Sequence, residues 1–366
     1  MQGAEIYIFG FAFSVLWLIF AESYRSKYRK FGREKDNKYG HWFLLFSCLS
    51  IYLIMAFRYN VGIDNDNYLN NFQSIRSIKD IAEYYEPGFG LLTYLCNVLF
   101  GDYQVFIFIT SIITGILFFK TLYRDADFLV LALLGFVSVN LYFMSFTVIR
   151  QFLAIAVVLM SIPYIEKQKP WQFLAIWAIA ISLHYSAALF GLVYFFSMES
   201  KWLTNKVKII ILATLAVLTI TYTELIIGEV LQTAALLRET YADLEYTGDT
   251  NNLNMLLSVI PGLLVIIFFH KSLIKANPTN KVYIWMYLIF VLTKILGHYV
   301  PFMSRTHFYF DIAFVVLMSY LPRLTPKATR PIVYLVLVLY FAHFINNIFV
   351  YQPDDFLPYH SIFNKH

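Results

Sequence analysis

Ten apolar runs, each about the length of a membrane-crossing helix, dominate this chain of 366 residues. A crossing helix needs roughly 20 mainly apolar residues, and in lipid its backbone polar groups must be bonded within the segment. The runs therefore predict helices that span a bilayer. They cover residues 3–21, 41–57, 103–122, 128–146, 148–165, 207–227, 254–270, 282–299, 305–321 and 331–350.

The composition supports one class of protein. Apolar residues make up 59% of the chain and charged residues only 14%, which is more apolar surface than a soluble domain needs. We predict an all-α polytopic integral membrane protein in which residues 1–366 form a single transmembrane domain. The formal charge of +5 does not indicate nucleic acid, because Lys and Arg are scattered in short loops. Cys48 and Cys96 give neither a disulfide framework nor metal-ligand spacing.

The loop charges predict an orientation, because Lys and Arg collect on the cytoplasmic side. Most Lys and Arg lie in six loops, near residues 22–40, 120–127, 166–169, 199–208, 270–281 and 322–330. The loops 58–87 and 228–254 and the tail 351–366 hold five Lys and Arg against twelve Asp and Glu. We therefore predict that both termini lie outside, and that outer loops 58–102 and 228–254 cover an outward-facing chamber.

Two stretches are ambiguous. Residues 88–100 are apolar but span only about 20 Å as a helix, so we interpret them as a re-entrant or interfacial helix. Residues 170–198 carry no formal charge and have His184 in the middle. They predict two short passes, or a broken hairpin, that turn at His184. The expected total is about twelve transmembrane helices, with ten to twelve compatible with the pattern.

Arg150 is the only formally charged residue between Phe128 and Ile165. An arginine at the centre of a bilayer costs about 3 kcal/mol on insertion scales unless it reaches a partner or water. A guanidinium fits phosphate or carboxylate with two parallel hydrogen bonds, so we predict an anion site. The alternative is that Arg150 snorkels to lipid phosphates at the outer surface.

The segment from Arg58 to Tyr68 opens the first outer loop with a turn around Gly62. One interpretation makes Arg58 an anion ligand and Asp64 or Asp66 a general base or an acceptor for sugar hydroxyls. Another is a solvated turn from which Arg58 snorkels. Asp64 and Asp66 also resemble a metal-binding pair, but no further carboxylate follows at ligand spacing, and we predict no metal.

Three other positions are candidates for the chamber. Glu86 precedes a helix start and either interacts with the helix dipole or accepts a hydrogen bond from a sugar or an arginine. His184 either bonds another helix or transfers a proton near neutral pH. His298 and Arg305 flank an outer turn, where Arg305 is a further phosphate candidate. Lys294 lies three turns further into the membrane than this turn. It is either a salt-bridge partner within the bundle or a site residue.

The sequence lacks the motifs that mark several classes of enzyme mechanism. Walker A, Gly-x-Gly-x-x-Gly, His-Glu-x-x-His and Cys-x-x-Cys motifs are all absent from the sequence. This argues against ATP-driven work, nicotinamide chemistry and zinc hydrolysis, and we predict no cofactor. The absence of an internal sequence repeat weakens the interpretation as an inverted-repeat transporter.

In this order, these residues resemble the EpsG family of Wzy-type polysaccharide polymerases, from about residue 2 to residue 350. The matching pieces are Arg58-Tyr59-x-x-Gly62-x-Asp64-x-x-x-Tyr68, Glu86-Pro87-Gly88-Phe89, Arg150-Gln151-x-x-Ala154, His184-x-Ser186-Ala187, and Arg305 followed by Tyr309-Phe310. No single piece is specific, but the ordered set on a scaffold of many spans is.

The resemblance implies a bacterial inner (cytoplasmic) membrane enzyme with a fold of the membrane glycosyltransferase (GT-C-like) type. It would join lipid-linked oligosaccharide repeat units on the periplasmic side to build O-antigen, capsule or exopolysaccharide. The implied partners are a donor and an acceptor glycan on undecaprenyl pyrophosphate, membrane lipid and a chain-length regulator protein. Nucleic acid is not among them.

Within this chemistry the candidate residues receive expected roles. Arg58, Arg150 and Arg305 would neutralise the departing pyrophosphate. His184, Asp64, Asp66 or Glu86 would take the proton of the acceptor hydroxyl. The expected sugar-binding residues are Tyr59, Tyr68, Gln151, Tyr185, His298 and Tyr309. Two other functions stay open: a flippase or transporter for an anionic lipid-linked oligosaccharide, and a membrane O-acyltransferase.

Overall fold

The computed structural model describes residues 3–30, 38–201, 203–222, 252–299, 303–351 and 356–364, and within them all regular elements are helices. Residues 228–251 of the predicted outer loop 228–254 lie outside the described residues. The α-helices are α1 (Ala4–Lys30), α2 (Lys38–Ala56), α3 (Asn65–Ser74), α4 (Ile81–Tyr84), α5 (Pro87–Phe100), α6 (Tyr103–Asp125), α7 (Leu129–Ser138), α8 (Leu141–Thr147), α9 (Ile149–Val158), α10 (Ile162–Glu166), α11 (Pro170–Leu183), α12 (Gly191–Ser197), α13 (Asn205–Thr221), α15 (Asn252–Ala276), α16 (Asn280–Tyr299), α17 (Ile312–Ser319), α18 (Leu321–Leu324) and α19 (Arg330–Tyr351). The 3-10 helices include η2 (Ile78–Asp80), η3 (Leu159–Ser161), η4 (Tyr185–Phe190) and η7 (Thr306–Tyr309).

The predicted all-α polytopic membrane architecture is confirmed. Among the described residues, 6 helices are long and apolar enough to cross a bilayer, or up to 7 if the bent pair α7 and α8 is one span. This is fewer than the ten to twelve crossings predicted. The difference arises because several predicted spans are apolar helices of only 10–17 residues, among them α11 and the segment of η4 and α12.

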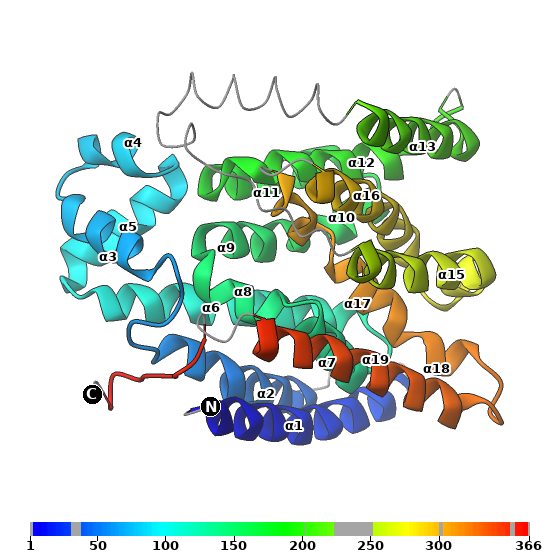
Figure 1. The fold of residues 1–366 in the computed structure, drawn as a ribbon, viewed down its shortest axis with the longest axis horizontal. Coiled ribbons are helices and arrows are strands. Elements are labelled where there is room, and N and C mark those ends of the chain that lie inside the picture. Colours follow the sequence, from blue (N-terminus) through cyan, green and yellow to red (C-terminus); the bar gives the residue numbers. More distant parts are fainter. Residues whose placement is uncertain are drawn as a thin grey trace.

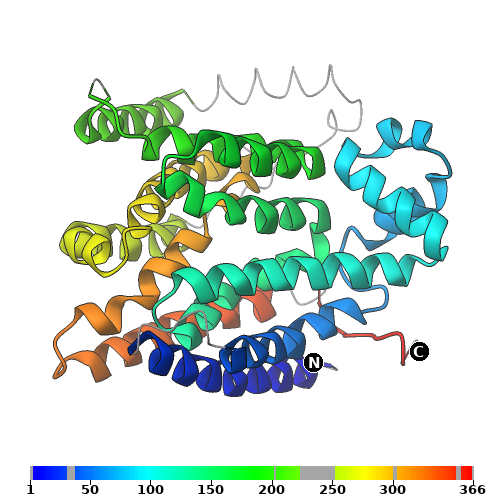
Figure 2. The same cartoon turned by 180° about the vertical axis from the view of Figure 1, so that it is seen from behind.

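The helical body has two distinct ends (Figures 1 and 2). Both chain termini lie at one end together with α3, α4 and α5, and we call this the terminal end. There, the backbone N–H of Tyr59 donates to the carbonyl of His360 at 2.9 Å. The opposite end carries α18, and there Arg25 donates to the carbonyl of Ala126 at 2.8 Å. The first two basic loops predicted to share a side therefore meet, and we call this the basic end.

Helix α5 ends before it can become a long span. It begins after Glu86 in an extended conformation, with Pro87 in its first turn. It ends at Gly101, whose φ of +63° lies in the left-handed region, and Asp102 then caps α6 by accepting from the N–H of Gln104 at 2.8 Å. At 14 residues it is about 21 Å long, as expected for the predicted re-entrant or interfacial helix.

The apolar stretch 170–198 folds as a hairpin. Helix α11 ends just before His184, and η4 begins just after it. The two arms contact each other, because the ring of Phe173 stacks on Tyr194 with centroids 4.6 Å apart. Trp177 Nε1 also donates to the carbonyl of Ala187 at 3.0 Å. The prediction of a turn at His184 is confirmed.

The predicted span 128–146 is broken. Asn140 has a φ of +62° between α7 and α8, which are bent by 49°. An Asn tolerates this left-handed conformation better than most residues. A second irregular position, Val148, separates α8 from α9. The break and this link place Arg150 in the first turn of α9 and not in the middle of a long helix.

Candidate functional site

A charged cluster centred on Glu86 joins three separate parts of the chain. Glu86 lies at the start of α5 and its side chain is only 6% exposed. Its Oε2 accepts a hydrogen bond from Nη1 of Arg150 in α9 at 2.9 Å. Its Oε1 lies 2.7 Å from Nδ1 of His184, at the turn of the hairpin. Burying a carboxylate is costly unless it is paired, and here both oxygens have a partner.

The two partners keep Glu86 charged. Burial raises the pKa of the Glu86 carboxyl, but the hydrogen bond from His184 and the charge of Arg150 outweigh burial and lower that pKa to about 2. Glu86 lies outside the candidate spans. In a neutral His184 ring, the nitrogen facing the carboxylate carries the proton, and Nε2 is the free acceptor. The pair therefore orients His184 for proton transfer through Nε2.

Arg150 is held from two sides. Besides its bond to Glu86, its guanidinium lies over the ring of Tyr85, 5.2 Å from the centroid. Its Nε is buried and has no hydrogen-bond partner within the described residues. The side chain is 32% exposed. These contacts turn the arginine toward Glu86, and an anion site at Arg150 stays a prediction.

Arg305 lies next to the first turn of α9. Gln151 is buried, and its Nε2 donates to the backbone carbonyl of Arg305 at 2.8 Å. The Arg305 side chain is 55% exposed, and its Nη1 lies 3.9 Å from Oδ2 of Asp64. An exposed ion pair this long contributes little to stability. The structure thus brings Arg305 and Asp64 near the Glu86 cluster and leaves the Arg305 guanidinium able to bind another anion.

Tyr68 and Tyr309 were expected to stack on sugars, but their rings are not exposed in the structure. Tyr68 and Tyr309 are both buried, so their ring faces are covered by protein. The Tyr309 hydroxyl lies 3.0 Å from Oγ of Ser186, two residues after His184. The Tyr68 hydroxyl accepts from the backbone N–H of Arg150 at 3.4 Å. These residues lie close to the cluster, but they offer hydroxyl groups and not stacking surfaces.

The structure gives Arg58 a different role from the predicted one. Arg58 is 2% exposed, and its Nη1 and Nη2 donate to the carbonyls of Met55 at 2.8 Å and Phe146 at 3.0 Å. Carbonyls in the last turn of a helix lack helical partners, and those of Met55 in α2 and Phe146 in α8 are of this kind. Arg58 therefore fastens the end of α2 to α8, and its burial removes it from the predicted set of pyrophosphate ligands.

Four other candidates lie at the periphery of the described structure. Asp66 is exposed in the first turn of α3 and accepts a 3.4 Å hydrogen bond from Asn65. Tyr59 and Tyr185 are exposed. His298 is partly buried near the end of α16. Their roles in sugar binding or proton transfer stay predictions.

Two features were missed by sequence reasoning. The Tyr85 ring packs against Arg150, and its position directly before Glu86 was the available signal.

His307 is buried and contacts two charged residues. Its Nδ1 lies 2.9 Å from Asp311, and its Nε2 lies 3.2 Å from Lys294. The four-residue spacing of His307 and Asp311 was the signal there. Lys294 thus contacts a histidine within the bundle, and both its predicted salt bridge and its predicted site role stay predictions.

Comparison with known proteins identifies a family. The model of the EpsG family matches residues 41–361, a range that contains Glu86, Arg150 and His184. No curated protein and no solved structure matches the chain, so the GT-C-like type of fold stays a prediction. Within the described residues, no group of three or more His, Cys, Asp or Glu side chains is arranged to hold a metal ion.

Proposed function

Because this chain belongs to the EpsG family, we propose that it joins lipid-linked oligosaccharide repeat units into a polysaccharide by glycosyl transfer. The family supports a role of the polysaccharide-polymerase type, and the helices are those of a multi-pass membrane protein. The proposed donor and acceptor are glycans on undecaprenyl pyrophosphate. The site lies toward the terminal end, away from the basic loops, and this supports an inner-membrane protein whose site faces the periplasm.

The contact between Glu86 and His184 carries this proposal, with Nδ1 and Oε1 2.7 Å apart. In the proposed reaction an acceptor hydroxyl attacks the anomeric carbon of the donor sugar. A new carbon–oxygen bond forms as the bond to the pyrophosphate breaks. Nε2 of His184 takes the hydroxyl proton, and the Glu86 carboxylate stabilises the imidazolium that results.

The other candidate bases are less suited to this step. Glu86 has both oxygens engaged, and its pKa of about 2 makes it a weak base. Asp64 faces Arg305, and Asp66 is exposed at the start of α3. Of the four candidates, His184 alone combines a free acceptor nitrogen with a partner that fixes the ring.

The departing polyprenyl pyrophosphate needs positive charge. The Arg150 side chain is 32% exposed and bonds Glu86 through Nη1, and Arg305 is exposed beside it. Guanidinium groups placed where charge develops lower the barrier most in a site that excludes water. We assign Arg150 the main contact to the phosphates and Arg305 a second contact that replaces its long pair with Asp64.

The test uses purified protein and lipid-linked repeat units, without nucleotide sugar or acyl-CoA. Polymer is expected. His184→Asn keeps a donor near the position of Nδ1, so it can still face Glu86, but it lacks Nε2. We expect its rate to fall about 10²- to 10⁴-fold, the usual worth of a general base. His270→Asn changes an exposed histidine in α15 and is the matched control.

An unchanged rate in folded His184→Asn would eliminate His184 as the base. If no polymer forms but the glycan crosses into vesicles, the protein is a flippase and not a polymerase. Glycan modified only when acyl-CoA is present would indicate the O-acyltransferase. A chain-length regulator as a protein partner stays a prediction.

A further inference from the structure

The short helix η7 lies between the proposed phosphate ligands and the turn of the hairpin. Before its first residue, the carbonyl of Arg305 accepts a hydrogen bond from Nε2 of Gln151 in α9 at 2.8 Å. At its last residue, the Tyr309 hydroxyl lies 3.0 Å from Oγ of Ser186, in the first turn of η4. One short segment therefore contacts both sides of the proposed site.

The residues of η7 are held firmly by the helices around them. Nε2 of His307 lies 3.2 Å from Nζ of Lys294 in α16. The ring of Phe308 packs against that of Phe152 in α9, with centroids 5.4 Å apart. Tyr309 follows directly and is fully buried. Side chains in such a close-packed interior have little freedom to move, so the Tyr309 hydroxyl is a fixed point.

The turn of the hairpin needs a contact of this kind. His184 alone separates the end of α11 from the start of η4, and its backbone is extended. The hydrogen bond from Trp177 to the carbonyl of Ala187 joins the two arms of the hairpin to each other. That bond does not fix the turn relative to Glu86. The position of the imidazole therefore depends on contacts between the turn and other parts of the chain.

Two such contacts join η4 to the end of η7. The first is the pair of hydroxyls of Ser186 and Tyr309. The second joins the next residue, Phe310, to Phe190 at the end of η4, with nearly parallel rings whose centroids are 6.3 Å apart. The start and the end of η4 are thus both tied to neighbouring residues of one fixed segment.

We propose that Tyr309 is a positioning residue for His184. By holding Ser186, it keeps Nδ1 of His184 against Glu86 and leaves Nε2 directed toward the substrate. A misplacement of about 1 Å can slow a reaction about 100-fold, so a base must lie at a fixed distance from the reacting groups. Because η7 also contacts the first turn of α9, it sets the distance between the base and the phosphate ligands. The effect on rate rests on the proposed polymerase reaction, but the contact itself does not.

The first test needs no substrate. Nitrogen-15 NMR of the full-length protein, labelled at histidine and held in detergent, reports which ring nitrogen carries the proton. The His184 signal is the one that His184→Asn removes. At about pH 8.5, where most histidines are neutral, we expect the wild-type proton on Nδ1. In Tyr309→Phe the fraction of His184 with the proton on Nε2 should rise at least about twofold, and an unchanged fraction overturns the proposal.

The second test measures the rate of polymer formation. Tyr309→Phe should lower kcat about tenfold and change KM less than about twofold, because the base is displaced while the contacts to the substrate remain. Ser186→Ala should act in the same way, and the double variant should lose no more than either single one, since both hydroxyls belong to one contact. Ser186→Thr keeps a hydroxyl and should retain most of the rate. Additive losses, or a loss confined to KM, would overturn the proposal.

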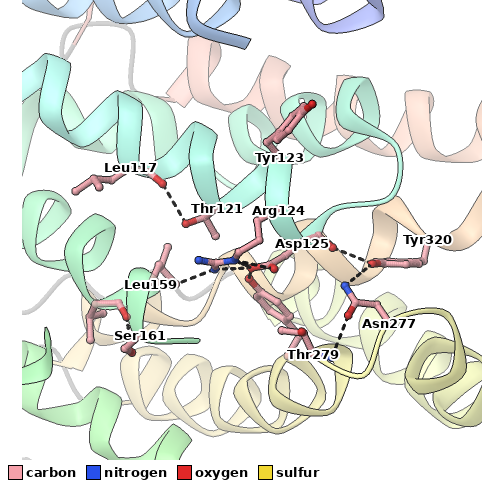
Figure 3. Close-up of polar contacts among 12 residues, drawn as sticks. Leu117, Thr121, Tyr123, Arg124, Asp125, Leu159, Ser161, Asn277, Thr279 and Tyr320 are labelled. Carbon is pink, nitrogen blue, oxygen red and sulfur yellow. Dashed lines mark hydrogen bonds and ion pairs between the residues drawn. The ribbon is translucent and has the colours of Figure 1, made fainter. Parts of the chain in front are cut away.

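Tyr320→Phe is the matched control, because it removes another buried tyrosine hydroxyl far from the Glu86 cluster. At the basic end, the Tyr320 hydroxyl donates to the carbonyl of Asp125 at 2.9 Å and accepts from Asn277 at 3.1 Å (Figure 3). Its kcat per folded molecule and its His184 signal should equal those of wild type. Equal changes in the two tyrosine variants would show a general loss of stability and overturn the proposal.

Failure of the positioning role can be told apart from failure of the proposed function. If the wild-type protein forms no polymer, the proposed function is wrong, and the NMR experiment still decides whether Tyr309 holds His184. If wild type forms polymer and Tyr309→Phe matches it in both measurements, the positioning role alone is wrong.

Discussion

Nδ1 of His184 lies 2.7 Å from Oε1 of Glu86, although the two residues are 98 positions apart in the chain. The same carboxylate binds Arg150 through its other oxygen. One buried side chain therefore orients the proposed base and also holds the proposed cation for the leaving group. The following predictions test the parts of this arrangement separately.

Glu86→Gln should lower the rate of polymer formation about 100-fold or more, because an amide does not stabilise the imidazolium that His184 becomes. The KM for the lipid-linked substrate should change less than kcat, since the bonds to Arg150 and His184 can partly persist. Single-turnover assays with the purified variant measure this. A loss confined to KM would show that Glu86 serves only in substrate binding.

The stability of the protein should depend on Glu86 at low pH. Burial raises the folded-state pKa of Glu86, but His184 and Arg150 outweigh burial and lower that pKa from an ordinary value of 4.5 to about 2. The unfolded chain therefore binds the proton more readily, and the stabilisation is complete above pH 4.5 and is lost as pH falls toward 2. The unfolding midpoint should fall more steeply between pH 5 and 3 in wild type than in Glu86→Gln. Parallel curves would contradict this.

Arg150→Lys should reduce the rate about 10- to 100-fold while the protein stays folded. Lysine keeps the charge but cannot form two parallel bonds to phosphate. Arg323→Lys is the control, because Arg323 forms an exposed ion pair with Asp127 far from the cluster, and its activity should be unchanged. Equal activities of the two variants would show that any positive charge suffices at position 150.

Arg58→Gln should act on stability. Arg58 satisfies the carbonyls of Met55 and Phe146, and removing a buried partner costs about 3 kcal/mol. We expect a lower unfolding midpoint in detergent, and a rate per folded molecule close to that of wild type. A stable variant without activity would instead support the predicted contact between Arg58 and the substrate.

Gly88→Ala should separate α5 from α11. A Cβ at Gly88 would lie 2.3 Å from Oγ and 2.9 Å from the backbone carbon of Ser182, so the backbone must move. That movement would draw Glu86 away from His184 and lower the activity at least tenfold. Gly135→Ala is the control, because its Cβ would meet only ordinary contacts at 3.5 Å or more. Comparable activities would show that the two helices can separate without disturbing the site.

Much of the fold could be predicted, because an apolar run in lipid has few alternatives to a helix. The turn at His184 and the early end of α5 also followed from length and from single polar or glycine residues. The break at Asn140 did not, because one Asn in an apolar run has no distinct signature until its φ is known. The length of a run also does not reveal how its helix is interrupted, which is why several predicted spans are apolar helices of only 10–17 residues in the described structure.

The candidate site could be predicted only in part. Glu86, Arg150 and His184 were all candidates, but no periodicity links positions 64 and 98 residues apart, so their pairing was not predictable. Arg58 was assigned to the substrate because a charge at a helix end suits two roles equally well. Only the positions of the neighbouring carbonyls distinguish them.

The order of these residues along the chain matters during synthesis. Glu86 precedes Arg150 by 64 residues, and His184 comes later still. A ribosome therefore delivers the carboxylate to the membrane before the arginine that needs it, and the histidine arrives at a pair that already exists. Glu86 without its partners would be an unpaired carboxylate in an incomplete protein, so a chain interrupted before α9 should be recognised by quality-control proteases more readily than one interrupted after it.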